Sequence, residues 1–249
     1  MWLLVNSFKT NQELFTSPWS FPGNINFSNY ERAIVVGNVG KFFLNSVFVA
    51  VITVSLTILS SAMAAYGVSR LRWKFSKFVY ALLISGIMIP QHSTVVPLFY
   101  IFQKLGLYNT YSAVIIPHLI FAIPMAVFIL TGYFSAIPKE LEEAALIDGY
   151  SLGRTFFQVI MPVTLPSLVT VAVVTFIPVW NDLLFPQIFL SEQRKMTLPV
   201  GLTTFMGRYS TDYVGLIAAV VITIIPTIVA YIILHDRIID GMTAGAVKG

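Results

Sequence analysis

Long uncharged apolar runs are the feature that most constrains how this chain can fold. Phe42–Gly67 contains no charged residue and is longer than the roughly 20 residues that a helix needs to cross a bilayer. Further predominantly apolar runs cover residues 78–103, 111–134, 166–185 and 213–234. Backbone polar groups in a bilayer must be satisfied within the segment, which favours helices. Because only 10% of the residues are charged, against roughly 25% in soluble domains, we predict an all-α, polytopic membrane protein with five full transmembrane helices.

Loop charge predicts how these helices are oriented. Residues 68–77 carry four basic residues, Arg72 among them, and no acid, so the positive-inside rule places this loop in the cytoplasm. The external loop 187–212 fits the rule less well, since it carries charges of both signs. Alternation predicts one membrane domain with an external loop (6–41), spans (42–134), a cytoplasmic segment (135–162), further spans (163–234) and a cytoplasmic tail (235–249).

The polar segment Ser135–Pro162 lies between two apolar runs and holds four of the eleven acidic residues. Pro138 and the glutamates after it favour the first turn of a helix, where a missing N–H costs nothing and negative charge is stabilised. Gly149 supplies a left-handed stop for that helix, and Ser151 can cap a second one. Pro162 marks the next change of direction. We therefore predict two short helices joined by a tight turn, on which a partner docks.

The spacing within this segment resembles the signature of ABC importer permeases, which reads E-A-A, three residues, G, nine residues, then I-x-L-P. Here Glu143-Ala144-Ala145 is followed by Gly149 and, at residues 159–162, by V-I-M-P. In that family the segment forms a coupling helix in a cleft of a cytoplasmic ATPase subunit. The resemblance implies an ATPase-coupling set of Glu143, Ala144, Ala145, Asp148 and Gly149.

The residue types in this helix suit a docked role. Leu141, Ala144, Ala145 and Asp148 share one face at i, i+3, i+4 and i+7, and the alanines permit close approach of a partner. Glu143 can pair with a basic group of that partner or cap the neighbouring turn. The alternative is an amphipathic helix that simply lies at the membrane interface between two spans.

Other segments resemble carbohydrate permeases related to the smaller membrane subunit of the maltose importer. These segments are residues 6–9, 180–182, 197–202 and the tail 241–249. The tail is the most discriminating. A Gly-rich chain end is usually just frayed, whereas the resemblance implies that this tail threads between ATPase subunits. Since that subfamily has a complete first span, we interpret residues 1–5 as a remnant of one. A truncated start, a misassigned start and a genuine five-span variant all stay open.

The resemblance implies the permease subunit of an ATP-driven sugar importer in a bacterial or archaeal plasma membrane, with its C-terminus in the cytoplasm. Its partners would be a homologous second permease, two cytoplasmic ATPase subunits and an external sugar-binding protein. ATP and Mg would be bound by the ATPase, so this chain would hold no cofactor and would not be an enzyme. The sequence has no P-loop and no cysteine. We attribute its net charge of +4 to cytoplasmic loops rather than to nucleic-acid binding.

Polar residues inside the apolar runs are candidates for the sugar path. An ionised carboxylate in a span costs about 2.5–3.5 kcal/mol, so Asp182 should face protein or water. With Trp180 and Asn181 it is the first candidate, against the alternative of a polar contact at the end of a helix. Gln91 and His92, between two prolines, are the second candidate, and a structural role for them competes evenly.

Three alternatives to a sugar importer are open at this point. An ABC permease for another small solute would share the coupling segment. A secondary transporter would show inverted repeats and buried charges for ion coupling, and neither is evident here. A membrane-embedded enzyme would need a convergent set of acids, bases or metal ligands. The three histidines are widely separated, so we predict no metal site and interpret His118 as a local hydrogen-bond partner.

Overall fold

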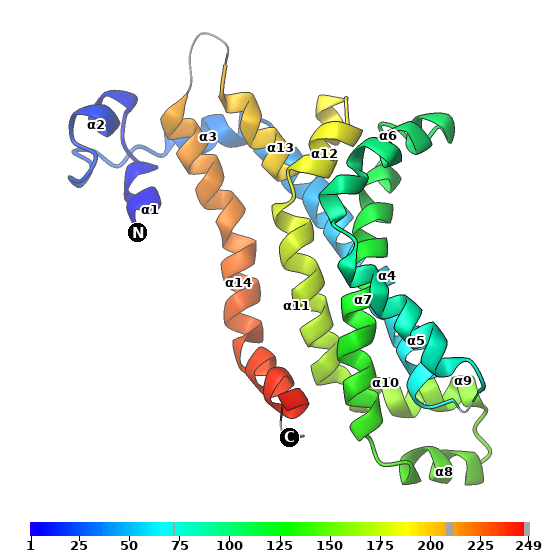
Figure 1. Cartoon of the computed structure of the whole chain (residues 1–249). Coiled ribbons are helices and arrows are strands. Elements are labelled where there is room, and N and C mark those ends of the chain that lie inside the picture. Colours follow the sequence, from blue (N-terminus) through cyan, green and yellow to red (C-terminus); the bar gives the residue numbers. More distant parts are fainter. Residues whose placement is uncertain (72, 208–211, 247–249) are drawn as a thin grey trace. The chain divides into compact units, whose positions relative to one another are not determined.

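The computed structural model describes residues 1–71, 73–207 and 212–246, which form helices joined by short connections (Figure 1). No strand occurs among these residues, and the predicted all-α fold is confirmed. Side chains are described up to residue 229 and at 231–232, apart from the gaps just given. Arg72 and residues 247–249 of the predicted tail lie outside the described residues.

Two compact units divide the chain. Unit 1 comprises residues 1–50, 96–114 and 180–230, and unit 2 comprises residues 51–95, 115–179 and 231–249. Long helices contribute residues to both units: α4 (Val39–Ser69), α7 (Ser112–Ala136), α11 (Leu165–Asn181) and α14 (Tyr213–Ala246).

The N-terminal part of unit 1 is helical where the sequence predicted a loop. Residues 1–41 contain α1 (Trp2–Asn6), α2 (Asn11–Thr16) and α3 (Ser28–Val35). A capping box starts α2: the Thr10 hydroxyl accepts the N–H of Glu13 at 3.2 Å, and the Glu13 carboxylate accepts the N–H of Thr10 at 2.8 Å. Buried Asn29 donates to the carbonyl of Ser7 at 2.9 Å. These contacts order residues 6–41 into short helices, and the external position of this segment stays a prediction.

The predicted fourth span, 166–185, is also corrected. Helix α11 ends at Asn181, and a separate helix, α12 (Leu184–Phe189), follows in unit 1. The cause is local: the Asp182 carboxylate accepts the N–H groups of Leu184 and Phe185 at 3.1 and 3.2 Å, which begins a new helix.

The rest of unit 1 includes a helix that packs closely on the first part of α4. Its remaining helices are α6 (Val95–Lys104), η4 (Gln193–Lys195), α13 (Leu198–Leu202) and η5 (Thr203–Phe205). Gly201 lies directly against the Phe42 ring, and a Cβ atom at Gly201 would come within 2.0 Å of it. A glycine is therefore required for α13 to approach α4 this closely.

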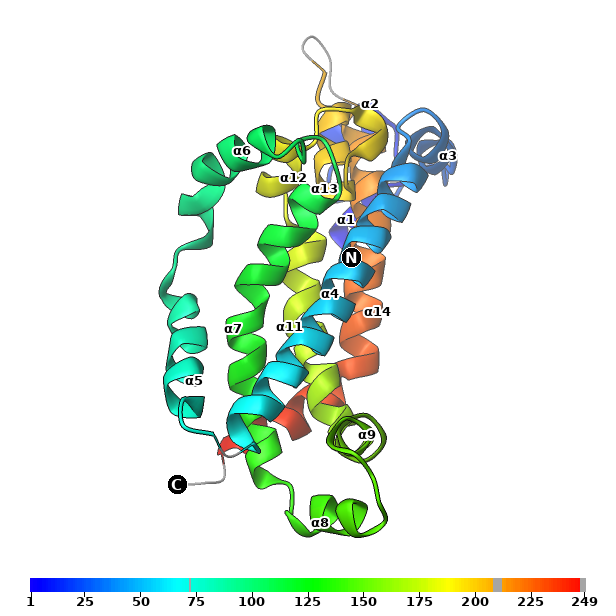
Figure 2. The ribbon, with the colours of Figure 1, turned by 90° about the vertical axis from the view of Figure 1, so that its right-hand side faces the viewer.

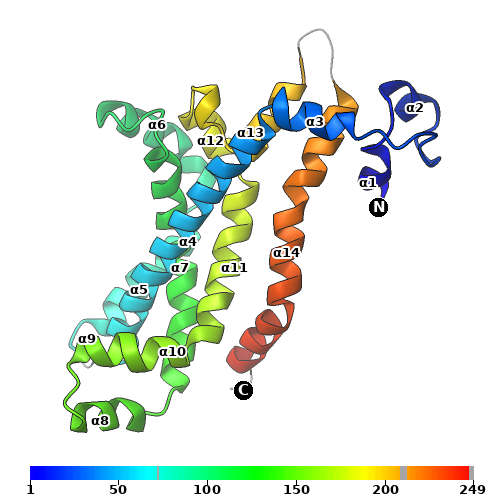
Figure 3. The same cartoon turned by 180° about the vertical axis from the view of Figure 1, so that it is seen from behind.

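Unit 2 is organised around the second parts of α4, α7 and α11, which lie side by side (Figures 2 and 3). Its other helices are α5 (Ser76–Ser85), η1 (Gly86–Met88), η2 (Gln91–Thr94), α8 (Glu140–Ile147), α9 (Leu152–Thr155), η3 (Phe156–Ile160) and α10 (Met161–Val163). One apolar core joins α4, α7, η3 and α11, and it is formed by Ala62, Ala65, Tyr66, Ala126, Val127, Leu130, Phe134, Phe156, Ile160, Leu168 and Val171.

The predicted second span, 78–103, is not one continuous helix. It is interrupted between η1 and η2, where Ile89 has an extended backbone with φ −80° and ψ 117°. Pro90 explains the interruption, because proline disfavours the helical conformation of the residue before it.

By length and composition, α4 and α7 can each cross a membrane among the described residues. The count rises to four if each bent helix pair is one span, and Tyr213–Val229 adds a shorter apolar helix. Five full spans therefore stay a prediction.

Candidate functional site

Helix α8 is the first element of the candidate site, and it ends at the glycine stop that the sequence predicts. Gly149 has φ +79°, the left-handed conformation that glycine adopts without strain. The N–H of Tyr150 donates to the carbonyl of Ala145 at 2.9 Å, and that of Gly149 donates to Leu146 at 3.0 Å. This pair of bonds is a Schellman motif, so the predicted glycine stop is confirmed. Pro138 itself lies just before the helix, which starts at Glu140.

The second short helix follows at once. The Ser151 hydroxyl accepts the N–H of Arg154 at 3.4 Å, which confirms the predicted cap. The Arg154 guanidinium lies 4.4 Å from the centre of the Tyr150 ring. Helical structure continues through Pro162 to Val163, and the next helix, α11, is bent by 78° from it. The change of direction therefore comes just after Pro162.

The predicted docking face of α8 is divided in the structure. Ala145 is buried against its own chain, whereas Glu143, Ala144, Asp148 and Gly149 are exposed. Large apolar side chains are exposed beside them, including Ile147, whose exposed fraction is 85%. The segment thus presents small, acidic and apolar groups on its outer surface.

Two residues that the sequence analysis did not single out hold α8 in place within unit 2. Arg70 follows the end of α4, and its guanidinium binds the Glu142 carboxylate at 2.7 Å. The same guanidinium donates to the carbonyls of Phe134 and Ile137, at 3.2 and 2.9 Å, at the end of α7. Among the acids that open α8, Glu142 therefore points inward while Glu143 stays exposed.

The candidate path residues in unit 1 have different environments. Trp180 is buried, with its indole N–H donating to the carbonyl of Thr223 at 3.1 Å and its ring edge-to-face with Phe43. Asn181 is exposed. Asp182 is half-buried and caps α12, which agrees with the alternative prediction of a polar contact at the end of a helix.

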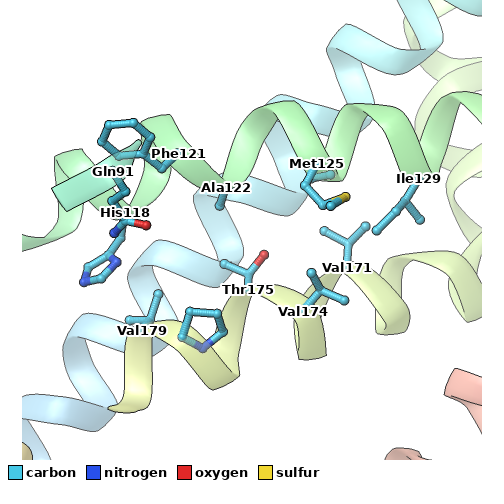
Figure 4. Close-up of a pocket in the computed structure, with 12 residues that line it drawn as sticks. Gln91, His118, Phe121, Ala122, Met125, Ile129, Val171, Val174, Thr175 and Val179 are labelled. Atoms are coloured by element: carbon cyan, nitrogen blue, oxygen red, sulfur yellow. The ribbon is translucent and has the colours of Figure 1, made fainter. Parts of the chain in front are cut away.

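In unit 2, Gln91 and His118 lie at one end of a cavity of about 200 Å³ between α7 and α11 (Figure 4). Its walls are otherwise mostly apolar, with Phe121, Met125, Val174 and Thr175 among them. His118 is buried, whereas His92 is exposed and does not line this cavity. Gln91 therefore lines the same cavity as His118, and His92 does not line it.

Part of the mixed charge of the loop 187–212, which the sequence predicts to be external, is paired within unit 1. Glu192 binds Arg194, Lys195 at 3.1 Å and the Asn109 amide at 2.6 Å. The hydrogen bond from Arg194 is the main cause that lowers the pKa of Glu192 to about 2, with Lys195 and Asn109 adding to it. Since these charges neutralise one another locally, the loop's basic residues are a weaker departure from the positive-inside rule than their number suggests.

No group of three or more His, Asp or Glu side chains that could hold a metal ion occurs among the residues searched in the described part of the chain.

Comparisons with known proteins agree over nearly the whole chain. Residues 56–242 match the family described as "binding-protein-dependent transport system inner membrane component". A diacetylchitobiose uptake system permease of Streptomyces coelicolor is 36% identical over 250 residues, covering 100% of this chain and 83% of that protein. A trehalose transport system permease of Mycobacterium tuberculosis is 36% identical over 231 residues, covering 92% and 84%.

A solved structure has the same fold. It is the crystal structure of a bacterial ABC transporter involved in the import of the acidic polysaccharide alginate. One chain of that structure matches this chain with a TM-score of 0.84. The match covers 94% of this chain and 88% of that one at 20% sequence identity.

Proposed function

Since this chain belongs to the family of inner membrane components of binding-protein-dependent transport systems, we propose that it is the permease subunit of an ATP-driven sugar importer. The observation that carries the sugar assignment is full-length similarity to permeases named for diacetylchitobiose, trehalose and melibiose/raffinose/stachyose. As a permease component, the chain is a multi-pass plasma membrane protein and not an enzyme.

The finer proposal gives each part of the chain a role within one permease domain. A second permease completes the translocation path, two ATPase subunits bind in the cytoplasm, and a sugar-binding protein delivers substrate from outside. Five spans and a cytoplasmic C-terminus, whose tail contacts the ATPases, belong to this proposal. ATP and Mg are held by the ATPase subunits, which move the permease between inward- and outward-facing states.

Helix α8 is the proposed contact with the ATPase. The exposure of Glu143, Ala144, Asp148 and Gly149 supports this role, as does the exposed apolar surface at Leu146 and Ile147. A solvated helix with such a surface is typical of a docking site, because burying apolar area on a partner is favourable. Buried Ala145 contributes by seating α8 on its own chain.

The proposal is tested by copurifying the chain with its partner subunits and reconstituting them in vesicles. We expect uptake of labelled oligosaccharides, from a panel including trehalose and melibiose, that requires internal ATP and the external binding protein. Amino acids and phosphate in the same panel test the alternative of another solute. Uptake driven by a proton or sodium gradient without ATP would instead make the chain a secondary transporter.

Asp182 has a capping role that must be separated from a role in the sugar path. Asparagine caps helices about as well as aspartate, and its one side-chain carbonyl oxygen can keep one of the two cap bonds, so Asp182→Asn should largely preserve the α12 cap while removing the charge. We expect Asp182→Asn to assemble normally and to lower sugar uptake, and Asp182→Ala to cost about 1 kcal/mol of stability in addition. Uptake and apparent Tm are measured together. Unchanged uptake by Asp182→Asn would leave Asp182 with the capping role alone.

A further inference from the structure

All three guanidinium nitrogens of Arg70 donate hydrogen bonds within unit 2. An arginine guanidinium has five N–H donors in a planar arrangement. Nε and Nη2 donate to one Glu142 carboxylate oxygen at 3.1 and 2.7 Å, and Nη1 donates to the carbonyls of Phe134 and Ile137. Nη2 also reaches the carbonyl of Pro138 at 3.5 Å. With only 5% of its side chain exposed, Arg70 depends on these partners for its charge to be buried.

These contacts join the end of α4 to two consecutive helices, α7 and α8, that follow it at a distance in the sequence. Arg70 continues the last turn of α4, since its N–H donates to the carbonyl of Tyr66 at 2.9 Å. Phe134 and Ile137 belong to the end of α7 and the connection after it, and Glu142 lies in the first turn of α8. Cations are favoured at the carbonyl end of a helix and anions at its N–H end, so both helix ends suit the charges placed there.

Besides this ion pair, α8 is joined to α7 by a short connection and lies beside aromatic side chains at the end of α4. The neighbouring packing is aromatic: Tyr66 of α4 lies edge-to-face with Phe134 at 6.2 Å and against Phe156 at 5.1 Å. Those rings hold α4 against α7 and η3, and the Tyr66 hydroxyl also interacts with the Glu142 carboxylate of α8. The Arg70–Glu142 ion pair is thus the main polar contact between the end of α4 and α8, and Glu142 is the residue of α8 on which both α4 side chains converge.

We propose that Arg70 and Glu142 are positioning residues that make α8 and the end of α4 move together when the ATPase moves α8. This inference rests on the proposed function, because it concerns how a displacement of α8 reaches the transmembrane helices. A sub-ångström shift passes through a packed, hydrogen-bonded contact, whereas it is absorbed by a loose one. Glu142 and Glu143 then have different roles: Glu143 faces the ATPase, and Glu142 faces α4.

The main test compares Glu142→Gln with Glu140→Gln. Both remove one charge from the first turn of α8, but Glu140 is exposed, whereas Glu142 holds Arg70. In Glu142→Gln the Arg70 bonds to the α7 carbonyls persist, so only the α4–α8 contact is weakened. We expect this variant to bind the ATPase and hydrolyse ATP, with about tenfold less sugar transported per ATP, a typical magnitude for coupling between sites. Glu140→Gln should keep the normal ratio.

The ratio of sugar transported to ATP hydrolysed distinguishes a positioning role of Glu142 from a general effect on protein stability. A purely structural defect would lower the amount of complex, and with it ATP hydrolysis and transport in proportion. Arg70→Lys offers a second variant, since lysine keeps the charge but has three donors instead of five. It should also lower the ratio. Normal ratios in both Glu142→Gln and Arg70→Lys would overturn the inference.

A distance measurement tests the inference independently of sugar. The chain has no cysteine, so nitroxide labels can be placed at Met63→Cys on α4 and at Lys139→Cys at the start of α8, both exposed positions outside the proposed docking surface. In the otherwise unchanged complex we expect the same label-to-label distance with and without ATP, and in Glu142→Gln a distance that changes with ATP. Equal behaviour of the two proteins would contradict the proposal.

Failure of the proposed function is recognised separately. If no ATPase copurifies with the unmutated chain, the function is wrong. The spread of the Met63–Lys139 label distances in the purified chain alone then still tests the contact. We expect a broader spread in Glu142→Gln than in Glu140→Gln, and equal spreads would refute the link.

Discussion

Replacing Glu143 with lysine is expected to abolish copurification of the ATPase while the chain still folds and inserts into the membrane. Glu143 is exposed at the start of α8, so reversing its charge disturbs little within the chain. On a docked surface it would oppose the basic group of the partner that glutamate attracts. Losing a charge pair across an interface typically costs about 2–5 kcal/mol, which corresponds to at least about 30-fold weaker binding.

The matched control for this prediction is Glu140→Lys, an equal change of charge in the same first turn of α8. ATPase recovered per unit of permease is the quantity to compare, together with ATP-dependent uptake. Gly149→Trp should also reduce recovery, because a side chain at φ +79° strains the turn that ends α8. If Glu143→Lys retains the ATPase as well as Glu140→Lys does, α8 does not dock through its acidic first turn.

The parts of this molecule that the sequence predicted correctly are governed by neighbours along the chain. Gly149 ends α8 and Ser151 caps α9 because both devices involve residues within about five positions of each other. Apolar length alone identified α4 and α7. The T-x-x-E pattern at Thr10 and Glu13 was equally local, and reading it as a capping box would have found α2.

Contacts between distant residues account for what the sequence did not predict. Arg70 and Glu142 are 72 positions apart, and nothing in either local sequence indicates that they pair. The only available signal was an arginine at the end of an apolar run facing an excess of acids in the next cytoplasmic segment. Hydropathy likewise averages over Ile89 and Pro90, so it merges two helices that the backbone keeps apart.

Trp180 is another residue whose environment depends on distant elements, and the predicted path role conflicts with its packing. Its exposed fraction is 1%, and its contacts are Phe43 on α4 and the carbonyl of Thr223 on α14. Within this chain it is therefore a core side chain of unit 1. A direct role in the sugar path would require a rearrangement of the surrounding residues that exposes the Trp180 side chain.

Trp180→Ala is therefore expected to destabilise the protein by about 3–5 kcal/mol, the usual cost of truncating a buried aromatic residue. At roughly 2–4 °C per kcal/mol, the apparent Tm of the purified protein should fall by about 10 °C. Trp19→Ala is the matched control, since Trp19 is 85% exposed and its loss should change the apparent Tm little.

Trp180→Phe then separates packing from chemistry. It keeps most of the ring volume against Phe43 but removes the N–H that Thr223 accepts, which should cost about 1–3 kcal/mol because a buried carbonyl loses its donor. If Trp180 is a core residue, uptake by Trp180→Phe should follow the amount of folded protein in the membrane. If Trp180 contacts sugar, uptake should fall further than that amount, with a raised half-saturation concentration, because the aromatic surface and donor offered to the ligand both change. Measuring uptake per folded permease against the shift in apparent Tm for Trp180→Phe and Trp180→Ala decides between the two, and we expect both variants to retain normal uptake per folded molecule.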